Sequence, residues 1–237
     1  MLVLQSFLNG QVLLFDKPME WTSFDVVRKI RYMTRVSKVG HAGTLDPLAT
    51  GLLIVCTGKY TKKINEYMGM EKEYTGTFTL GATTPTYDLE SDPENHQSIA
   101  HLTDAMIEAA TAQFTGDILQ MPPQHSAIKK NGERLYISAR KGLVVEVDPR
   151  PVTIHSFTIE KIALPLVYFK VVCGTGTYIR SLANDYGAAL GVGAYMSSLR
   201  RTRIGEFSVD NAKTIPAFEV ELKEMRATLE GQTDTEL

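Results

Sequence analysis

Three β-prone segments in the second half of the chain follow one another with only short turns between them. Residues 144–147, 152–159 and 166–173 are rich in Val, Ile, Thr, Phe and Tyr, and proline or charged residues separate them. Residues 74–80 alternate large apolar residues with threonine, which is typical of a half-buried strand. Consecutive strands favour antiparallel pairing. We therefore expect an α+β fold with a mixed, mostly antiparallel central sheet flanked by helices and loops, and not a doubly wound nucleotide-binding fold.

Three helices are predicted from capping residues followed by apolar positions at helical spacing. The expected N-caps are Ser23, Thr103 and Thr177. The apolar positions expected to face the core are Val27, Ile30, Tyr32 and Met33 in the first helix, Met106, Ile107, Ala110 and Phe114 in the second, and Ile179, Leu182, Ala183 and Tyr186 in the third. Residues 81–98, rich in Thr, Asp, Pro and Asn, are expected to form a long surface loop.

Composition excludes several classes of protein. The chain has 237 residues, 43% of them hydrophobic and 22% charged, which suits a folded protein with a real core. It contains no apolar run near the roughly 18 residues that a membrane span needs, and its first residues lack the basic lead of a signal peptide. Cys56 and Cys173 lie far apart in apolar segments, so neither a disulfide framework nor a zinc knuckle is expected. We expect no membrane association and a cytoplasmic location.

The distribution of charge is more informative than the net charge of −2. Residues 17–72 and 118–213 carry an excess of Lys and Arg, whereas residues 73–117 between them contain neither. Two basic segments therefore flank an acidic one, and a local basic surface suited to nucleic acid can coexist with a slightly acidic total.

The stretch Gly40–Leu53 is the least ordinary part of the sequence. Its glycines, with Pro47 directly after Asp46, predict a shaped loop and not a regular helix or strand. Asp46 is the only carboxylate between Asp25 and Glu66, so its charge requires compensation. It can cap a short helix that begins at Pro47. His41 and Asp46 can also be read as metal ligands, but no third ligand lies at a recognisable spacing, and no metal is expected.

This stretch, with the run Gly40-His41-Ala42-Gly43-Thr44-Leu45-Asp46-Pro47, resembles the signature loop of the tRNA pseudouridine-55 synthase (TruB) family. Further motifs extend the resemblance over roughly residues 12 to 210. They are Lys17-Pro18 with Thr22-Ser23, Lys72-Glu73-Tyr74 with Leu80-Gly81, Thr84, Thr86 and Asp88, Pro122–Ala127 with Lys129, Gly132, Tyr136, Ala139-Arg140 and Gly142, Cys173–Ala183, and Leu199–Thr202 with Gly205.

The resemblance implies a pseudouridine synthase fold and the isomerisation of uridine 55 in the T loop of tRNA. No cofactor is expected, because the glycosidic bond from N1 to C1′ breaks, C5 joins the same carbon, and no atom is gained or lost. The resemblance makes Asp46 the catalytic carboxylate, Arg180 the cation that keeps it ionised, and Tyr178 a proton relay at C5. Whether Asp46 adds to C6, attacks C1′ or removes the C2′ proton stays open.

Substrate contacts also follow from the resemblance. The enzyme must swing the uridine out of the folded loop, with Tyr74 stacking on the uracil and His41 stacking in the RNA loop. Leu199 and Lys17 are expected to contact the substrate as well. A group of cations is expected to bind phosphates. They are Lys17, Lys59, Lys62, Lys63, Lys129, Lys130, Arg140, Arg200, Arg201 and Arg203.

Two departures from the family pattern matter. Glu20 stands where the first motif usually has glycine, so the backbone of that turn is in question. Many family members continue into a C-terminal RNA-binding PUA domain, and about thirty residues after Gly205 are too few for one. We therefore expect a catalytic domain over residues 1–213, a short helix and acidic tail over 214–237, no PUA domain, and a monomer.

Two other functions are weighed against this one. The chain can be a tRNA-binding folding helper whose catalysis is secondary, although intact Asp46 and Arg180 argue against lost activity. It can also be a catalytic subunit guided by RNA and accessory proteins, since that relative shares the aspartate loop. The short chain disfavours the second alternative.

Overall fold

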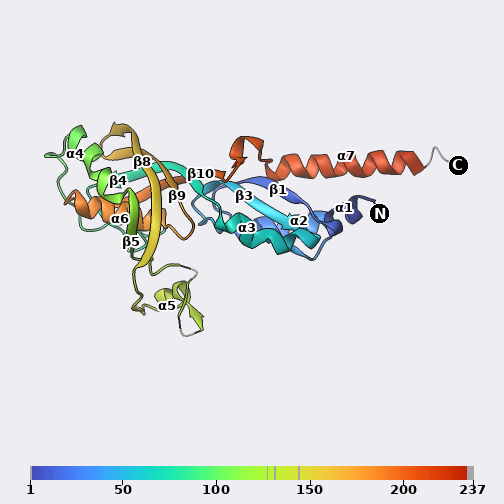
Figure 1. Ribbon diagram of the computed structural model, residues 1–237, viewed down its shortest axis with the longest axis horizontal. Helices are drawn as coiled ribbons and strands as arrows, with labels where there is room; N and C mark the ends of the chain where they lie inside the picture. Colours follow the sequence, from blue (N-terminus) through green and yellow to red (C-terminus); the bar gives the residue numbers. More distant parts are fainter. Residues whose placement is uncertain (1, 127, 131, 144, 234–237) are drawn as a thin grey trace. The chain divides into compact units, whose positions relative to one another are not determined.

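The computed structural model describes residues 2–126, 128–130, 132–143 and 145–233 (Figure 1). The chain divides into two compact units, one formed by Met1–Lys72 with Arg200–Leu237 and the other by Glu73–Leu199. Strand β10 (Ala194–Ile204) contains the second boundary and runs from one unit into the other. Among the described residues, no helix combines the length and apolar character that a membrane span requires.

The first unit is built around strand β3, which pairs with three other strands. Antiparallel partners are β1, with Val12 opposite Cys56 and Lys17 opposite Gly51, and β2. Strand β10 lies parallel to β3. The elements of this unit are α1 (Leu2–Asn9), β1 (Val12–Lys17), α2 (Ser23–Thr34), β2 (Val39–His41), β3 (Thr50–Thr57), η1 (Gly58–Lys63), α3 (Ile64–Gly69), β11 (Phe207–Ser208), η3 (Val209–Asn211) and α7 (Ile215–Thr233).

Helix α7 completes the core of the first unit. Phe218 packs edge-on against Phe7 and Phe15, with ring centroids 6.2 and 5.2 Å apart, and Leu222 is buried in the same cluster. The Arg226 guanidinium donates a 2.6 Å hydrogen bond to the carbonyl of Met33 at the end of α2. The C-terminal segment is helical as expected, but α7 is 19 residues long and not the short helix predicted, and its first half belongs to the folded core.

The second unit is a sheet in the order β10, β4, β9, β8, β5, with antiparallel pairing of β8 to β9 and of β5 to β8. Its aromatic core joins Phe78, Phe157, Phe169 and Tyr186. Helix α5 with strands β6 and β7 stands apart from this sheet (Figure 1). The elements are β4 (Lys72–Leu80), α4 (Asp104–Ala109), η2 (Ala110–Phe114), β5 (Gly116–Gln120), β6 (Lys129–Lys130), β7 (Glu133–Arg134), α5 (Leu135–Arg140), β8 (Arg150–Ala163), β9 (Leu166–Cys173) and α6 (Ile179–Ala189).

The helix caps differ in part from the expected ones. Thr103 caps α4 as predicted. Helix α2 is capped by Thr22 in a capping box with Asp25, because the Ser23 side chain is turned inward to Leu45. The N-cap of α6 is Tyr178, and the Thr177 hydroxyl instead donates to the Gly174 carbonyl. The cap assignments to Ser23 and Thr177 were therefore wrong by one residue.

Burial and strand assignments also show differences. Tyr32 is 79% exposed and Met106 43% exposed, so neither faces the core as predicted. Residues 145–147 form no strand, and Val144 lies outside the described residues. Residues 81–98 lack helices and extended strands as expected, yet Thr84, Thr86 and Asp88 in this segment are buried. Their burial indicates a structural use of that loop.

Candidate active site

Asp46 lies in the first unit, in the Asp46 turn, which we define as residues 42–49 between β2 and β3. The amide of Ala49 donates a 3.1 Å hydrogen bond to the Asp46 carbonyl, which closes a turn over Pro47 and Leu48. No helix begins at Pro47, so the alternative that Asp46 is a helix cap is wrong. At the start of the turn, the Ala42 amide donates to the Ile54 carbonyl at 2.9 Å.

Segment 17–23 holds the residues on both sides of Asp46. The Lys17 ammonium donates to the carbonyls of Pro18, Trp21 and Pro47 at 2.9, 2.6 and 3.2 Å. The Glu20 amide donates to the same Pro47 carbonyl at 2.8 Å. On the other side of Asp46, the Ser23 hydroxyl accepts from the Leu45 amide at 2.8 Å and donates to the Leu45 carbonyl. Both peptide neighbours of Asp46 are thus fixed from outside the turn.

Lys17 is fully buried, with 0% of its surface exposed. Burial lowers its pKa from 10.5 to about 8, the negative charge of Asp46 acts in the opposite direction, and the positive charge of Arg201 lowers the pKa further. An ammonium enclosed by three carbonyls has no free face for a phosphate. The substrate and phosphate contact expected of Lys17 therefore does not fit its position.

Arg201 is also buried, with 1% of its surface exposed. Its Nε donates to the Leu52 carbonyl at 2.8 Å and an Nη donates to the Gly43 carbonyl at 3.2 Å. The phosphate contact expected of Arg201 is incompatible with this burial. The contact with Gly43 links Arg201 to the start of the Asp46 turn.

His41 ends β2 and is half-buried. Burial lowers its pKa below the ordinary value, a backbone contact with Gly43 acts in the opposite direction, and the charge of Arg201 lowers the pKa as well. The Nδ1 atom is buried and has no hydrogen bond of normal geometry within the described part of the chain. The described residues contain no cluster of three or more metal-ligand side chains. Reading His41 and Asp46 as metal ligands therefore lacks a third ligand.

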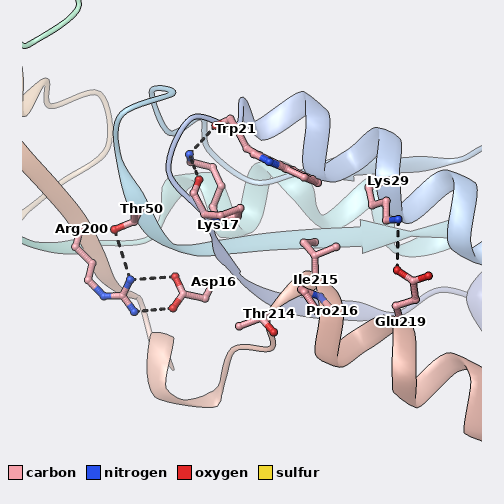
Figure 2. Close-up of a pocket in the computed structure, with 11 residues that line it drawn as sticks. Asp16, Lys17, Trp21, Lys29, Thr50, Arg200, Thr214, Ile215, Pro216 and Glu219 are labelled. Atoms are coloured by element: carbon pink, nitrogen blue, oxygen red, sulfur yellow. Dashed lines mark hydrogen bonds and ion pairs between the residues drawn. The ribbon is translucent and has the colours of Figure 1, made fainter.

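A pocket of about 570 Å³ opens on the first unit beside Lys17 (Figure 2). Trp21, Ile215 and Pro216 contribute apolar walls, and two ion pairs flank it. Arg200 donates to both oxygens of Asp16 at 3.0 and 2.7 Å, and Lys29 pairs with Glu219 at 3.4 Å. Asp46 is not among the lining residues. This pocket is therefore separate from the Asp46 turn.

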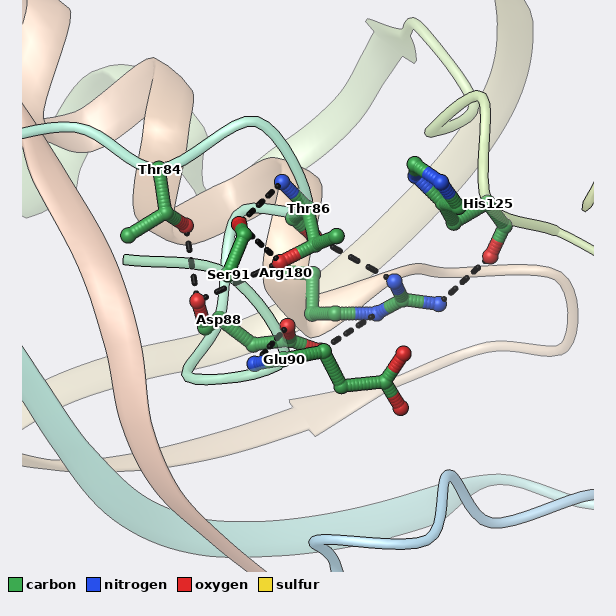
Figure 3. Close-up of polar contacts among 7 residues, drawn as sticks. All are labelled: Thr84, Thr86, Asp88, Glu90, Ser91, His125 and Arg180. Carbon is green, nitrogen blue, oxygen red and sulfur yellow. Dashed lines mark hydrogen bonds and ion pairs between the residues drawn. The ribbon is translucent and has the colours of Figure 1, made fainter. Parts of the chain in front are cut away.

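Arg180 lies in the second unit, in the first turn of α6, and is 4% exposed. Its guanidinium donates to the carbonyls of Thr86 and His125 at 3.3 and 2.9 Å, and its Nε lies 3.6 Å from Asp88 Oδ2 (Figure 3). Asp88, 1% exposed, also accepts from the Glu90 amide at 3.0 Å. A buried arginine thus pairs with a buried carboxylate. Sequence reasoning quoted Asp88 as part of a motif but assigned it no role.

Tyr178 precedes Arg180 by two residues and is half-buried. Gln120, the last residue of β5, binds both backbone groups of Tyr178: its Nε2 donates to the Tyr178 carbonyl at 3.0 Å, and its Oε1 accepts from the Tyr178 amide at 2.8 Å. Sequence reasoning missed Gln120, and no local pattern marks it because its partner is 58 residues away. Gln120 therefore fixes the start of α6.

The remaining predicted site residues are distributed between the two units. Tyr74 on β4 and Leu199 on β10 belong to the second unit and are 9% and 8% exposed. Lys59, Lys62 and Lys63 are exposed on the first unit. Arg200 and Arg203 pair with Asp16 and Glu71. The side chains of Lys129, Lys130 and Arg140 lie outside the described part of the structure.

Comparison with solved structures first defines the class of protein. The chain is similar to one in a Cbf5-Nop10-Gar1 complex, with a TM-score of 0.69, 31% identity, and coverage of 90% of this chain and 54% of the solved one. It is also similar to one in an H/ACA RNP bound to a substrate RNA containing 2′-deoxyuridine, with a TM-score of 0.67, 29% identity, and coverage of 89% and 53%. The chain spans about half the length of these solved chains. It has the α+β fold of the pseudouridine synthases, as expected.

Sequence comparison then gives the family. Residues 31–179 match the TruB family pseudouridylate synthase N-terminal domain, and residues 180–234 match the tRNA pseudouridylate synthase B C-terminal domain. The chain is 52% identical over 226 residues to tRNA pseudouridine synthase B of Flavobacterium johnsoniae, covering 92% of this chain and 99% of the relative. It is 46% identical over 219 residues to the Phocaeicola vulgatus protein of that name, covering 90% and 93%. This chain belongs to the TruB family.

Proposed function

We propose that this chain isomerises uridine 55 in the T loop of tRNA to pseudouridine, with Asp46 as the catalytic carboxylate. The observation that carries the proposal is the Asp46 turn of a TruB-family chain, fixed at both neighbours of Asp46 by Ser23, Lys17 and Glu20. A carboxylate held in this way is positioned before substrate arrives, so little ordering remains for the reaction step.

The other site residues stay part of the proposal. Arg180 supplies the cation that favours ionised Asp46, and Tyr178 relays the proton released at C5. Tyr74 stacks on the uracil and His41 stacks within the RNA loop, while Leu199 contributes an apolar contact. Burial of Tyr74 on a strand suits a core aromatic equally well, so the stacking role rests on the family resemblance.

The reaction needs neither redox chemistry nor an external group. The bond from N1 to C1′ breaks, the uracil turns over, and C5 bonds to C1′; C5 then releases its proton and N1 takes one up, so the composition is unchanged. Asp46 acts at C6, C1′ or the C2′ proton, and each of these routes uses one ionised carboxylate. We propose that the protein acts without a cofactor, as a monomer in the cytoplasm.

The test is tritium release from a T-arm RNA that carries tritium at uridine C5. The purified wild-type protein should release the label without guide RNA, and Asp46→Asn should not. Asp210→Asn, which changes an exposed carboxylate of the same unit, should leave release unchanged. Persistence of isomerisation in Asp46→Asn would refute the catalytic assignment.

The same variant separates the alternatives. A folding helper predicts that Asp46→Asn, which still binds tRNA, restores a strain lacking the protein, and the family comparisons do not favour this function. The similarity to a chain in an H/ACA RNP favours a guided subunit as the second candidate. Release of tritium by the protein and T-arm RNA alone would remove it.

A further inference from the structure

We infer that Arg201 is a positioning residue for the proposed reaction: its buried guanidinium fixes the Asp46 turn by binding the carbonyl of Gly43 at its start and the carbonyl of Leu52 beyond its end. The inference rests on the proposed function. It assigns Arg201 to the shape of the turn and not to RNA binding.

The two hydrogen bonds of Arg201 span the turn. Its Nη binds Gly43, three residues before Asp46, and its Nε binds Leu52, six residues after Asp46. Together with Lys17 on Pro47 and Ser23 on Leu45, these contacts leave carbonyls on both sides of Asp46 bound to buried or inward-facing donors. Arg201 is the only one of the three side chains that binds both before and after Asp46.

The backbone of Arg201 approaches the end of the turn as closely as a glycine allows. Arg201 pairs with Gly51 in the parallel register of β10 and β3. A Cβ atom built on Gly51 would lie 2.3 Å from the Arg201 carbonyl oxygen, and Gly51 has a φ of +102°. Only glycine fits here without a shift of one strand. The close approach of β10 to β3 therefore fixes the backbone position from which the Arg201 guanidinium reaches the turn.

The charge of Arg201 is unusual for a purely packing side chain. The two hydrogen bonds of its side chain to Leu52 and Gly43 go to carbonyl oxygens. Burial of a guanidinium carries a desolvation cost that an apolar side chain of similar volume would avoid. The positive charge acts on His41 and Lys17, the two titratable groups beside the turn. We conclude that the turn uses both the hydrogen bonds and the charge.

Arg200, at the adjacent position, has a side chain that is accessible to a phosphate. Its side chain is 40% exposed, and it pairs with Asp16 at the surface. Arg201 is 1% exposed. The two neighbours therefore predict different kinetic effects: loss of a surface arginine should raise KM, whereas loss of the buried one should lower kcat.

The experiment compares Arg201→Gln, Arg201→Lys and wild type in the tritium-release assay. We expect Arg201→Gln to lower kcat about 100-fold, because small displacements of a catalytic group have effects of this size. KM should stay within about 3-fold of wild type. Arg201→Lys should recover part of the loss, because its ammonium retains the charge and can still donate to one of the two carbonyls. Arg226→Gln, which removes a matched guanidinium contact to the Met33 carbonyl of the same unit, should leave kcat unchanged.

A second readout does not depend on activity. The imidazole of His41, assigned among the five histidines by its absence in His41→Gln, is titrated by NMR. Removing the positive charge in Arg201→Gln should raise the pKa of His41, and amides of the Asp46 turn should exchange faster. Arg226→Gln should change neither. If wild type released no tritium, the proposed function would fail, while the titration and the amide exchange would still test whether Arg201 fixes the Asp46 turn.

Each contrary outcome overturns the inference. Wild-type kcat in Arg201→Gln would show that the turn does not need the guanidinium. A raised KM with unchanged kcat would make Arg201 an RNA contact. Should Arg201→Gln fail to fold, Arg201→Lys decides: reduced kcat at unchanged KM supports positioning, and wild-type kcat excludes it. If neither variant folds, the role is structural only.

Discussion

The two units bury their cations in different ways. In the first unit, the hydrogen bonds of Lys17 and Arg201 go to backbone carbonyls around the Asp46 turn. In the second, Arg180 binds two carbonyls and also lies 3.6 Å from the buried carboxylate of Asp88. The first arrangement holds backbone carbonyls around Asp46 in place. In the second, the Asp88 carboxylate also holds the Arg180 side chain in place.

Because of this difference, substitutions around Asp46 should change the position of its carboxylate, whereas substitutions around Arg180 should change the charge beside its guanidinium. Around Asp46, the peptide groups on both sides are bound, so the carboxylate has a fixed origin and little room to readjust. Around Arg180, the Asp88 carboxylate stabilises the buried guanidinium. Removal of this carboxylate should therefore affect folding as well as activity.

The largest effect is expected from Asp46→Glu. The charge is retained, but the added methylene displaces the carboxylate, and a turn clamped at Leu45 and Pro47 cannot move back to compensate. We expect kcat to fall by at least about 100-fold, measured by tritium release. Asp210→Glu, an exposed position, is the matched control. Activity near wild type would show that the turn is more adaptable than its hydrogen bonds indicate.

The next effect is expected from Asp88→Asn. The amide keeps the size and the acceptor for the Glu90 amide but removes the charge beside Arg180. We expect the free energy of unfolding to fall by about 2–3 kcal/mol, because a buried guanidinium loses its carboxylate and retains its carbonyl partners. Urea denaturation measures the loss, and tritium release should show a lower kcat. Asp92→Asn, at an exposed position of the same loop, should change neither.

Sequence reasoning succeeded where the signal is local. The buried face of α6, the alternation of β4 and the cap at Thr103 follow from spacing alone. Within the expected loop Gly40–Leu53, the glycines and Pro47 correctly predicted the irregular turn at residues 42–49, but Gly40 and His41 belong to β2 and residues 50–53 to β3. These features depend on residues only a few positions apart, so the sequence contains what determines them.

It failed where a polar group is buried by distant chain. Lys17 was expected to contact the substrate and a phosphate, yet it is buried and donates to three carbonyls. Asp88 lies in a segment whose composition predicts a surface loop, and only α6 reveals its partner. Gln120 binds Tyr178 across 58 residues. Such contacts depend on tertiary structure, which no local pattern records.

The pH dependence of activity distinguishes the Lys17 contact from the Arg180 pair. Burial lowers the pKa of Lys17 to about 8, so the ammonium loses a proton just above neutral pH. The neutral amine has two N–H groups for three carbonyls, and the turn should loosen. We expect kcat to fall severalfold as the pH rises, with an apparent pKa near 8. Lys17→Met should lack this inflection, whereas Asp88→Asn should retain it.

Above about pH 8, where kcat is expected to fall, the free energy of unfolding should rise with pH. Between pH 8 and 10.5 the unfolded chain holds a proton on Lys17 that the folded chain has lost. The contribution of this group to the free energy of unfolding therefore rises with pH over that interval. Urea denaturation at several pH values measures the slope, and the difference between wild type and Lys17→Met isolates it. Equal slopes would contradict a buried Lys17.

The smallest effect is expected at Glu20, where the family usually has glycine. Glu20 has a φ of 67°, in the left-handed region, while its amide holds the Pro47 carbonyl. Glu20→Gly should relieve roughly 1–2 kcal/mol of strain and lose roughly 0.5–1 kcal/mol to the greater freedom of the unfolded chain. The net gain in the free energy of unfolding should lie between about 0 and 1.5 kcal/mol, with kcat unchanged because the amide remains. Arg35→Gly, at the left-handed end of α2 with a φ of 57°, is the matched control and should gain a similar amount. A loss of kcat in Glu20→Gly alone would show that the Asp46 turn depends on the stiffness of residue 20 as well as on its hydrogen bond.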